Sequence, residues 1–266
     1  MPIEEYENKI PPIKNRLLCC DVGNTSIKIS FIDGGIRKIW RILTLPHRSE
    51  DEYGLLMSLF LDRAQLQHPD GAVISSVVPE LTDKLVRAVR GAFGIEPLNV
   101  SMELKTGLTF EVKNPYEIGN DRIVNASAAY RLYKGSLIVI DIGTATTFCA
   151  VSEHGGYLGG PIIPGPQMFA SAMAEKTAKL PLISLNFTET VIGSSTAENM
   201  LAGIVIGQAG AVERIVFEIK NLLSSPVTTI TTGGFAYLVE PLVSCIDTFR
   251  PTLTFEGLSL IYALNT

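Results

Sequence analysis

The sequence is poor in the residues from which disulfide frameworks and thiolate metal sites are built. Its 266 residues include only four cysteines and three histidines, and no two cysteines stand in a C-x-x-C pair. The spacing of a zinc site is therefore missing. The cysteines are interpreted as small apolar residues of strands and core, in a protein kept in a reducing compartment: Cys19, Cys20, Cys149 and Cys245.

A long apolar run and an excess of positive charge are missing as well. The longest apolar stretch, Met200–Val212, is too short to span a bilayer, and the acidic residues 1–15 do not resemble a secretory signal. The net charge is -5, whereas a nucleic-acid surface needs a basic excess. We expect a soluble cytoplasmic protein without a membrane or nucleic-acid partner.

The chain contains one pattern twice. The segment "LLCCDVGNTSIKISFIDGG" begins at Leu17, and "LIVIDIGTATTFCAVSEHGG" begins at Leu137. An offset of 120 residues places Asp141 under Asp21 and Gly143 under Gly23. Each copy predicts a strand, a polar turn, a second strand and a glycine turn.

Helical periodicity alternates with these strands, which predicts an α/β protein. The helices are expected near Tyr53–Gln67, Thr82–Phe93, Ile123–Tyr133 and Glu198–Leu223. Two similar halves predict two lobes, each a mixed sheet with flanking helices, and a cleft between the lobes as the ligand site. The expected division is an extension over residues 1–15, a first lobe over 16–115 and a second over 116–266, with the boundary inside Leu108–Glu117.

Both Asp-x-Gly turns have the composition of a phosphate-binding loop. Glycine lets the backbone approach a ligand, the following hydroxyl and amide groups can donate to phosphate, and the aspartates can hold cations. Ordinary hairpin turns, in which Asp and Thr bond locally, are the alternative. The D-x-G-[NT]-[TA] pattern resembles the phosphate loops of the acetate kinase, sugar kinase, Hsp70 and actin superfamily. This resemblance implies two duplicated ribonuclease H-like (actin-like ATPase) domains. In such folds adenosine packs on a glycine pair, for which Gly233-Gly234 in "TTGGFA" is the candidate; a plain turn is the alternative.

A further segment narrows the resemblance. "NPYEIGNDRIVNASAAY", Asn114–Tyr130, is similar to the N-P-x-E-x-G-x-D-R segment of type III pantothenate kinases. Other motifs of that family occur in the same order, from Leu17 to the end of the chain: "DVGNTSIK", "SSVVP", "DIGTATTF", "YLGGPIIPG", "KTAKLP", "GSST" and "TTGG". On the residues alone, Asp121 and Arg122 could simply begin a helix, where an acid complements the helix dipole.

The resemblance implies a role for each motif. ATP, with Mg²⁺ near Asp21, would contact the first loop: Asp21, Val22, Gly23, Asn24, Thr25, Ser26, Ile27 and Lys28. Thr144, Gly233 and Gly234 would also contact ATP, and Asp141 would bind a monovalent cation, K⁺ or NH₄⁺. Pantothenate would be bound by Gly119, Asn120, Asp121, Arg122 and Thr196, with Asp121 as the base facing its primary hydroxyl. The family also implies a homodimer whose substrate pocket lies at the subunit interface.

One departure from the family pattern concerns a substrate contact, and a run of glycines indicates a packing surface. Many relatives have a substrate-contacting tyrosine seven residues before the glycine of G-x-D-R, where this chain has Val112. Glycines at Gly203, Gly207 and Gly210 weaken a helix, so we expect close packing there, on the same domain or on a partner chain. The implied function is phosphorylation of pantothenate to 4′-phosphopantothenate, the first step of coenzyme A synthesis. The alternatives are a nucleotide-binding regulator that has lost catalysis and a superfamily kinase for another small alcohol or carboxylate.

Overall fold

The computed structural model describes residues 15–223 and 226–266, which form two compact units. Unit 1 contains the described residues up to Thr106 together with Asn114–Ala128 and Thr254–Thr266. Unit 2 contains Gly107–Lys113 and Ala129–Leu253. The sequence places a single boundary between residues 115 and 116. In the structure, by contrast, the chain enters unit 1 three times.

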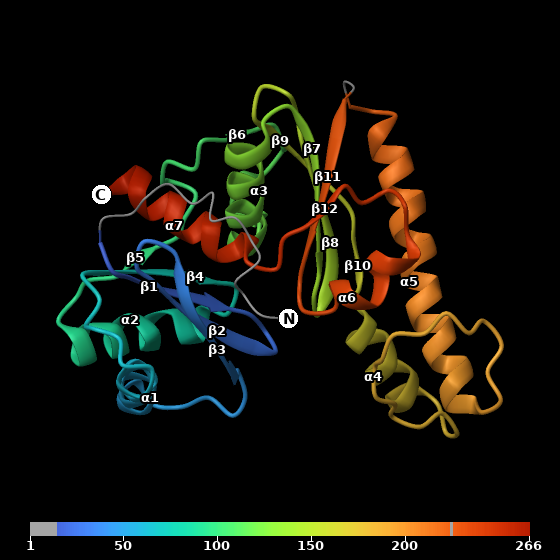
Figure 1. Ribbon diagram of the computed structural model, residues 1–266, viewed down its shortest axis with the longest axis horizontal. Helices are drawn as coiled ribbons and strands as arrows, with labels where there is room; N and C mark the ends of the chain where they lie inside the picture. The colour runs from blue at the N-terminus through green and yellow to red at the C-terminus, as the bar shows by residue number, and fades with distance from the viewer. Residues whose placement is uncertain (1–14, 224–225) are drawn as a thin grey trace. The chain divides into compact units, whose positions relative to one another are not determined.

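Unit 1 is built on a five-stranded mixed sheet (Figure 1). The strand order is β3 (Ile36–Leu43), β2 (Ser26–Ile32), β1 (Leu17–Val22), β4 (Gly71–Ser76) and β5 (Leu98–Asn99). The first three strands form an antiparallel meander, while β4 pairs parallel to β1 and β5 parallel to β4.

Helices cover both faces of this sheet. Leu18 and Cys20 belong to the core shared with α1 (Glu50–Arg63) and α2 (Pro79–Phe93). Leu17 and Cys19 belong to the opposite core, shared with α3 (Asn120–Tyr133) and α7 (Leu253–Asn265). Figure 1 shows these two helix pairs on opposite sides of the strands. The alternation of side chains along a strand explains why this apolar strand has two buried faces, and it also separates the adjacent thiols of Cys19 and Cys20.

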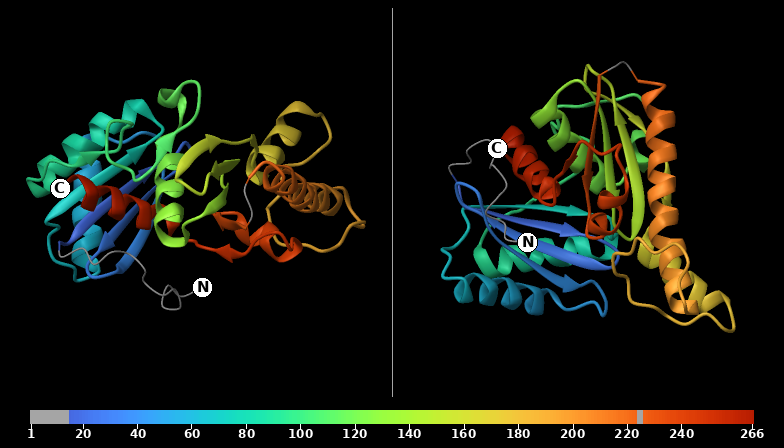
Figure 2. Two further views of the ribbon diagram at one scale, coloured as in Figure 1. Left: turned by 90° about the horizontal axis from the view of Figure 1, so that it is seen from above. Right: turned by 45° about the vertical axis from the view of Figure 1, so that its right-hand side comes forward.

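Unit 2 contains a second mixed sheet. Its order is β12 (Thr248–Phe249), β11 (Val227–Thr232), β7 (Ser136–Ile142), β8 (Ala145–Val151), β9 (Gly156–Gly159) and β6 (Thr109–Phe110), with β10 (Ile162–Pro164) paired to β8. The long helix α5 (Thr196–Lys220) runs along one face, visible in Figures 1 and 2, and shares a core with α6 (Ala236–Val239). Helix α4 (Pro166–Lys176) and the 3₁₀ turn Glu240–Leu242 also belong to unit 2, whereas the 3₁₀ turn Pro115–Glu117 belongs to unit 1.

The predicted duplication is confirmed at the level of topology. The order β3-β2-β1-β4-β5 of unit 1 is matched by β9-β8-β7-β11-β12 in unit 2, with the same parallel and antiparallel pairings. The two Asp-x-Gly turns differ in length, however. Gly23 N–H donates to Ser26 O, whereas Gly143 N–H donates to Ala145 O, both at 3.0 Å. The second turn is one residue shorter, so the 120-residue offset ends there.

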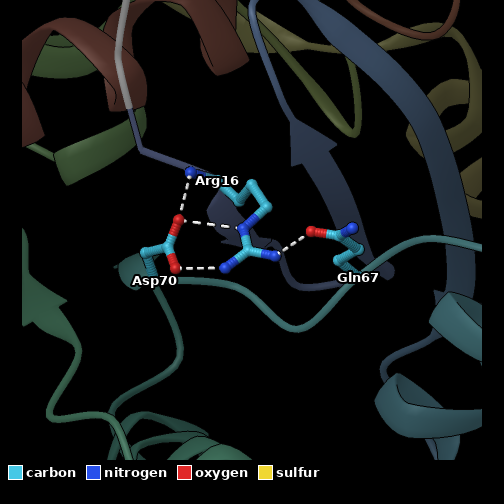
Figure 3. A network of polar contacts seen from close by, with 3 residues as sticks. All are labelled: Arg16, Gln67 and Asp70. Atoms are coloured by element: carbon cyan, nitrogen blue, oxygen red, sulfur yellow. Dashed lines mark hydrogen bonds and ion pairs between the residues drawn. The ribbon is translucent and has the colours of Figure 1, made fainter.

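The start of β1 is tied to the loop before β4 by a polar network (Figure 3). The backbone N–H and the Nε of Arg16 donate to Asp70 Oδ2 at 3.0 and 2.9 Å, and the guanidinium also contacts Asp70 Oδ1 and Gln67. Hydrogen bonds from the Arg16 side chain lower the pKa of Asp70 to about 2. This network holds the two parallel strands in register at the end opposite to the Asp21 turn.

Helix α5 is the one helix of the described chain that is long and apolar enough, by length and composition, to cross a membrane. It is longer than the apolar stretch at its centre, because charged residues extend it at both ends. Val205, Ala209, Val212 and Val216 of this helix are buried against the sheet of unit 2. A core helix satisfies the same criterion, so its length alone does not indicate a membrane span.

Candidate active site

The first Asp-x-Gly turn places three polar side chains in one row on the sheet of unit 1. Asp21, near the end of β1, pairs with Lys28 on β2 and with Ser75 on β4. Paired residues point to the same face, and here it is the face covered by α3 and α7. Lys28 Nζ lies 3.2 Å from Asp21 Oδ2, and the Asp21 side chain is 11% exposed. A nearly buried carboxylate therefore has an ammonium group on one side and a hydroxyl group on the other.

The turn after Asp21 is closed by hydrogen bonds to its backbone carbonyl groups, which leave its tip exposed. The Thr44 hydroxyl donates to Gly23 O at 2.6 Å, and Thr44 N–H donates to Thr25 O at 3.1 Å. Thr44 is itself buried, whereas Asn24 and Thr25 are exposed. The loop is thus fixed through its carbonyl groups, while the side chains at its tip face solvent. Exposed hydroxyl and amide groups at such a tip can donate to an anion.

The start of α3 positions Asp121 and Arg122. Asn120 Nδ2 donates to Val100 O at 2.9 Å and to Ser76 O at 3.3 Å, which anchors the helix to the ends of β4 and β5. Asp121 Oδ1 accepts the Arg122 N–H at 2.9 Å. A Cβ at Gly119 would lie 2.5 Å from that same Oδ1. Gly119 therefore makes room for the carboxylate, and Asn120, expected as a substrate contact, has its amide nitrogen committed to backbone carbonyls.

The environment of Asp121 is electrostatically unusual. Burial raises the pKa of Asp121 above its ordinary value, and the negative charge of Asp21 raises it further. The N–H bond and the positive charge of Arg122 act in the opposite direction but do not cancel the rise. The charge of Asp21 thus acts on the carboxyl group of Asp121 within unit 1, and carboxyl groups perturbed in this way are frequent at acid–base sites.

The second turn is held in a different way. Gly233 has φ +104°, and a Cβ there would lie 2.4 Å from Ile142 O and 2.5 Å from Asp141 Oδ1. Phe235 N–H donates to Ile142 O at 2.9 Å. The "TTGG" segment therefore packs directly against Asp141, in space that only glycine leaves open. Gly234, the other glycine of the pair, is exposed.

Two residues not expected from the sequence hold the Thr144 loop. Gly165 N–H donates to Thr144 O at 3.0 Å, and a Cβ on Gly165 would lie 2.5 Å from that oxygen. Gln208, buried on α5, accepts from the Thr146 hydroxyl at 3.1 Å and donates to Pro164 O at 2.7 Å. The signal for Gln208 was its position as a polar residue in the middle of an apolar helix.

The remaining candidate residues lie at other positions of unit 2. Thr196 is exposed in the first turn of α5, where the Ser195 hydroxyl accepts the Glu198 N–H at 3.2 Å. Val112, in the segment after β6, is 3.6 Å from the place of a Cβ on Gly159. Neither residue belongs to the Asp141–Gly233 contact.

The described residues contain no group of three or more His, Cys, Asp or Glu side chains that could hold a metal ion. Mg²⁺ is commonly held by one or two carboxylates together with substrate phosphates, and Asp21 fits that mode. The Asp141 carboxylate and the Ile142 carbonyl both border the space that a Cβ on Gly233 would fill. Two oxygen atoms beside this space fit a cation with oxygen ligands.

Comparison with known proteins identifies the family. Residues 17–218 match the family model for type III pantothenate kinase. A type III pantothenate kinase of Geobacillus thermodenitrificans is 43% identical over 249 residues, 92% of this chain and 96% of the relative. A type III pantothenate kinase of Moorella thermoacetica is 41% identical over 94% of this chain and its own full length.

Solved structures share the fold at low sequence identity. A protein assigned to the Baf family of transcriptional activators from Campylobacter jejuni aligns with TM-score 0.59 and 17% identity, over 92% of this chain and 97% of its own. The ethanolamine utilization protein EutJ from Carboxydothermus hydrogenoformans aligns with TM-score 0.52 and 15% identity, over 96% of this chain and 92% of its own. The predicted fold, a mixed α/β protein with two sheets and flanking helices, is confirmed. The family model and the two pantothenate kinase relatives show that the chain belongs to the type III pantothenate kinase family.

Proposed function

We propose that this protein transfers the γ-phosphoryl group of ATP to the primary hydroxyl of pantothenate. The products are ADP and 4′-phosphopantothenate, and the reaction is the first step of coenzyme A biosynthesis. The observation that carries the proposal is Asp121, whose half-buried carboxylate is held at the start of α3 under the influence of Asp21. The names of the relatives supply the substrate.

Residues 21–28 would bind the phosphates of ATP. The exposed tip at Asn24 and Thr25 offers donors to phosphate oxygens, and Lys28 offers a positive charge. Asp21 would hold Mg²⁺ bound to the phosphates. When bound, Mg²⁺ neutralises phosphate charge, which favours attack on the γ-phosphorus.

Asp121 would orient the hydroxyl of pantothenate and accept its proton. An ordinary aspartate is a weak base toward an alcohol, and a raised pKa brings it closer to the pH at which the enzyme works. Because the transition state of phosphoryl transfer is loose, catalysis depends mainly on aligning the hydroxyl with the γ-phosphorus. Asp121 can therefore accept the proton late in the reaction. Gly119 supports this role because any side chain at position 119 would collide with the Asp121 carboxylate.

Other residues would hold the two substrates. Arg122 provides a planar donor fork for the carboxylate or a carbonyl of pantothenate, and Thr196 would add a hydroxyl contact from α5. The amide of Asn120 anchors the helix, so its contribution to pantothenate would be indirect. Thr144 and the Gly233-Gly234 pair would contact ATP, and Asp141 would hold K⁺ or NH₄⁺.

We further propose that the enzyme acts as a cytoplasmic homodimer with the pantothenate pocket at the subunit interface. Gly203, Gly207 and Gly210 are exposed on α5, and apart from the adjacent backbone of that helix no described atom lies within 4 Å of a Cβ built on them. The close packing expected at these glycines is therefore not supplied by their own unit. Nearby in sequence, Leu182, Val191 and Ile192 are 68%, 70% and 85% exposed, an apolar surface that a second copy could cover.

A direct assay tests the proposed reaction. Purified protein is incubated with ATP, Mg²⁺, K⁺ and pantothenate, ADP release is followed by a coupled reaction, and the phosphorylated product is identified by mass spectrometry. Asp121→Asn should abolish pantothenate-dependent ADP release, whereas Asp83→Asn, an exposed acid on α2, should leave it intact. Unchanged turnover of Asp121→Asn would refute the assigned base, and no product from the unmodified protein would refute the substrate.

A further inference from the structure

The hydroxyl of Ser75 is buried beside the proposed phosphate site without a hydrogen-bond partner. Ser75 is 1% exposed, and its Oγ is one of the buried side-chain atoms of the described chain that form no hydrogen bond. An unpaired buried hydroxyl is unfavourable. Such groups are uncommon in native proteins and each one needs a reason.

The strand register explains what this hydroxyl faces. Ser75 on β4 is the parallel partner of Asp21 on β1, and both side chains point to the face covered by α3 and α7. On the other neighbouring strand, Lys28 Nζ donates to Asp21 Oδ2 at 3.2 Å. The Asp21 carboxylate thus accepts a hydrogen bond from Lys28, and a second possible donor, the Ser75 hydroxyl, lies at the neighbouring position on β4.

The two donors differ in how they respond to ATP. Lys28 is a long cationic side chain that a phosphate group can attract away from Asp21. Ser75 has a short side chain, and the strand register fixes its place next to Asp21. If Lys28 turns to the phosphates, Asp21 loses its hydrogen-bond donor just when its orientation matters for the bound cation. A small rotation of the Ser75 side chain would replace that donor.

We propose that Ser75 is a positioning residue for Asp21: when Lys28 turns to the phosphates of ATP, the Ser75 hydroxyl becomes the donor that holds the Asp21 carboxylate. This inference rests on the proposed ATP site but not on the identity of the phosphate acceptor. It predicts that the hydroxyl contributes to the ATP-bound state and not to the free protein. A purely structural serine would contribute equally to both.

The chain offers a matched control. Ser30 is also a buried serine with an unpaired Oγ, and it lies on β2, paired with Cys19 and so on the same face as Ser75. Ser30→Ala therefore removes the same atom from the same face of the same sheet. Ser30 pairs with Cys19, two residues before Asp21 on β1, and so is not the direct neighbour of that carboxylate. Removal of an unpaired hydroxyl should leave the stability of either variant unchanged or slightly higher.

The first experiment measures the dissociation constant of MgATP by calorimetry, without pantothenate. Ser75→Ala should weaken binding about tenfold or more, as expected for a lost hydrogen bond to a charged group. Ser30→Ala should bind as the unmodified protein does, and Ser75→Cys, with its weak S–H donor, should be intermediate. Unchanged affinity in Ser75→Ala, or equal losses in both alanine variants, would overturn the proposal. A loss of affinity together with a matching loss of stability would assign Ser75 a structural role and would overturn it too.

A double-mutant cycle tests the same idea without any ligand. In Lys28→Ala, Asp21 has lost its ammonium partner, so Ser75 should already donate to it in the free protein. Ser75→Ala should then lower stability in the Lys28→Ala background but not in the unmodified one, as measured by urea denaturation. Additive effects would contradict the proposal. Because neither experiment involves pantothenate, an enzyme with a different acceptor would fail the turnover assay and still give a clear answer here.

Discussion

Replacing Gly119 by alanine should damage catalysis while sparing the fold. A Cβ at this position would lie 2.5 Å from Asp121 Oδ1, and the next atoms, Asp121 Cγ and Val77 Cγ1, are 3.7 Å away. Gly119 is not among the described glycines with positive φ, so alanine can adopt its backbone conformation. The whole conflict therefore falls on one carboxylate oxygen.

The size of the effect follows from that distance. Ordinary contact begins near 3.4 Å, so the oxygen must retreat by about 0.9 Å. A displacement of about 1 Å in a catalytic group can reduce the rate about 100-fold. That oxygen also accepts the 2.9 Å bond from Arg122 N–H, so its displacement should disturb the bond that orients the carboxylate. We expect kcat/KM for pantothenate to fall about 100-fold, with a change in unfolding free energy of about 1 kcal/mol or less.

The assay compares Gly119→Ala with Gly91→Ala. Gly91 is exposed on α2, and nothing lies within 4 Å of a Cβ built there. Its replacement should leave kcat/KM unchanged and raise stability by about 0.5–1 kcal/mol through helix propensity. Stability is followed by the fluorescence of Trp40, which stacks on Phe60 in unit 1. Equal kcat/KM for the two variants would refute the idea that Gly119 sets the position of Asp121.

Three further predictions concern stability. Because burial raises the pKa of Asp121, its ionisation opposes folding, so Asp121→Asn should be more stable than the unmodified protein at pH 7. That difference should vanish below about pH 3.8, where the acid is protonated in both states, as urea denaturation across this range can check. Gly257→Ala should lose about 1–3 kcal/mol in urea denaturation, because its Cβ would lie 2.2 Å from Val124 O where α7 crosses α3. Asp70, with its pKa lowered to about 2 by Arg16, stabilises the fold above its unfolded value of 3.8 and loses this effect as the pH falls toward 2. Asp70→Asn should accordingly have a lower thermal midpoint at pH 7, and the difference should shrink as the pH falls from 3.8 through about 2.

The sequence predicted the features that repeat or alternate. The two apolar strands ending in Asp-x-Gly, the four long helices and the duplicated topology were all readable, because each rests on local periodicity. The expected helix near 123–133 is found as Asn120–Tyr133, so that Asp121 and Arg122 do begin a helix. This finding agrees with the simple alternative for the pair. It also agrees with a catalytic role, since the start of a helix is what presents the carboxylate.

Features that depend on long-range contacts could not be predicted. Nothing local in residues 253–265 indicates that α7 packs on a sheet whose strands lie more than 150 positions earlier in the sequence. Without this information, the sequence analysis placed a single boundary at 115/116. The shorter second turn was likewise hidden, because an ungapped offset aligns both copies well up to Gly143. The partners of Asn120 were unknown too, and they assign its amide to Val100 and Ser76.

Helix α7 is made at the end of synthesis but packs on the strands that are made first. Phe255, Leu258 and Ile261 complete the core on the Asp21 side of the first sheet, yet they are translated after all of unit 2. While the nascent chain emerges, the apolar residues Leu17, Cys19 and Val73 on that face have only part of their cover. The core on this face of the first sheet therefore cannot be completed until the end of the chain has been synthesised.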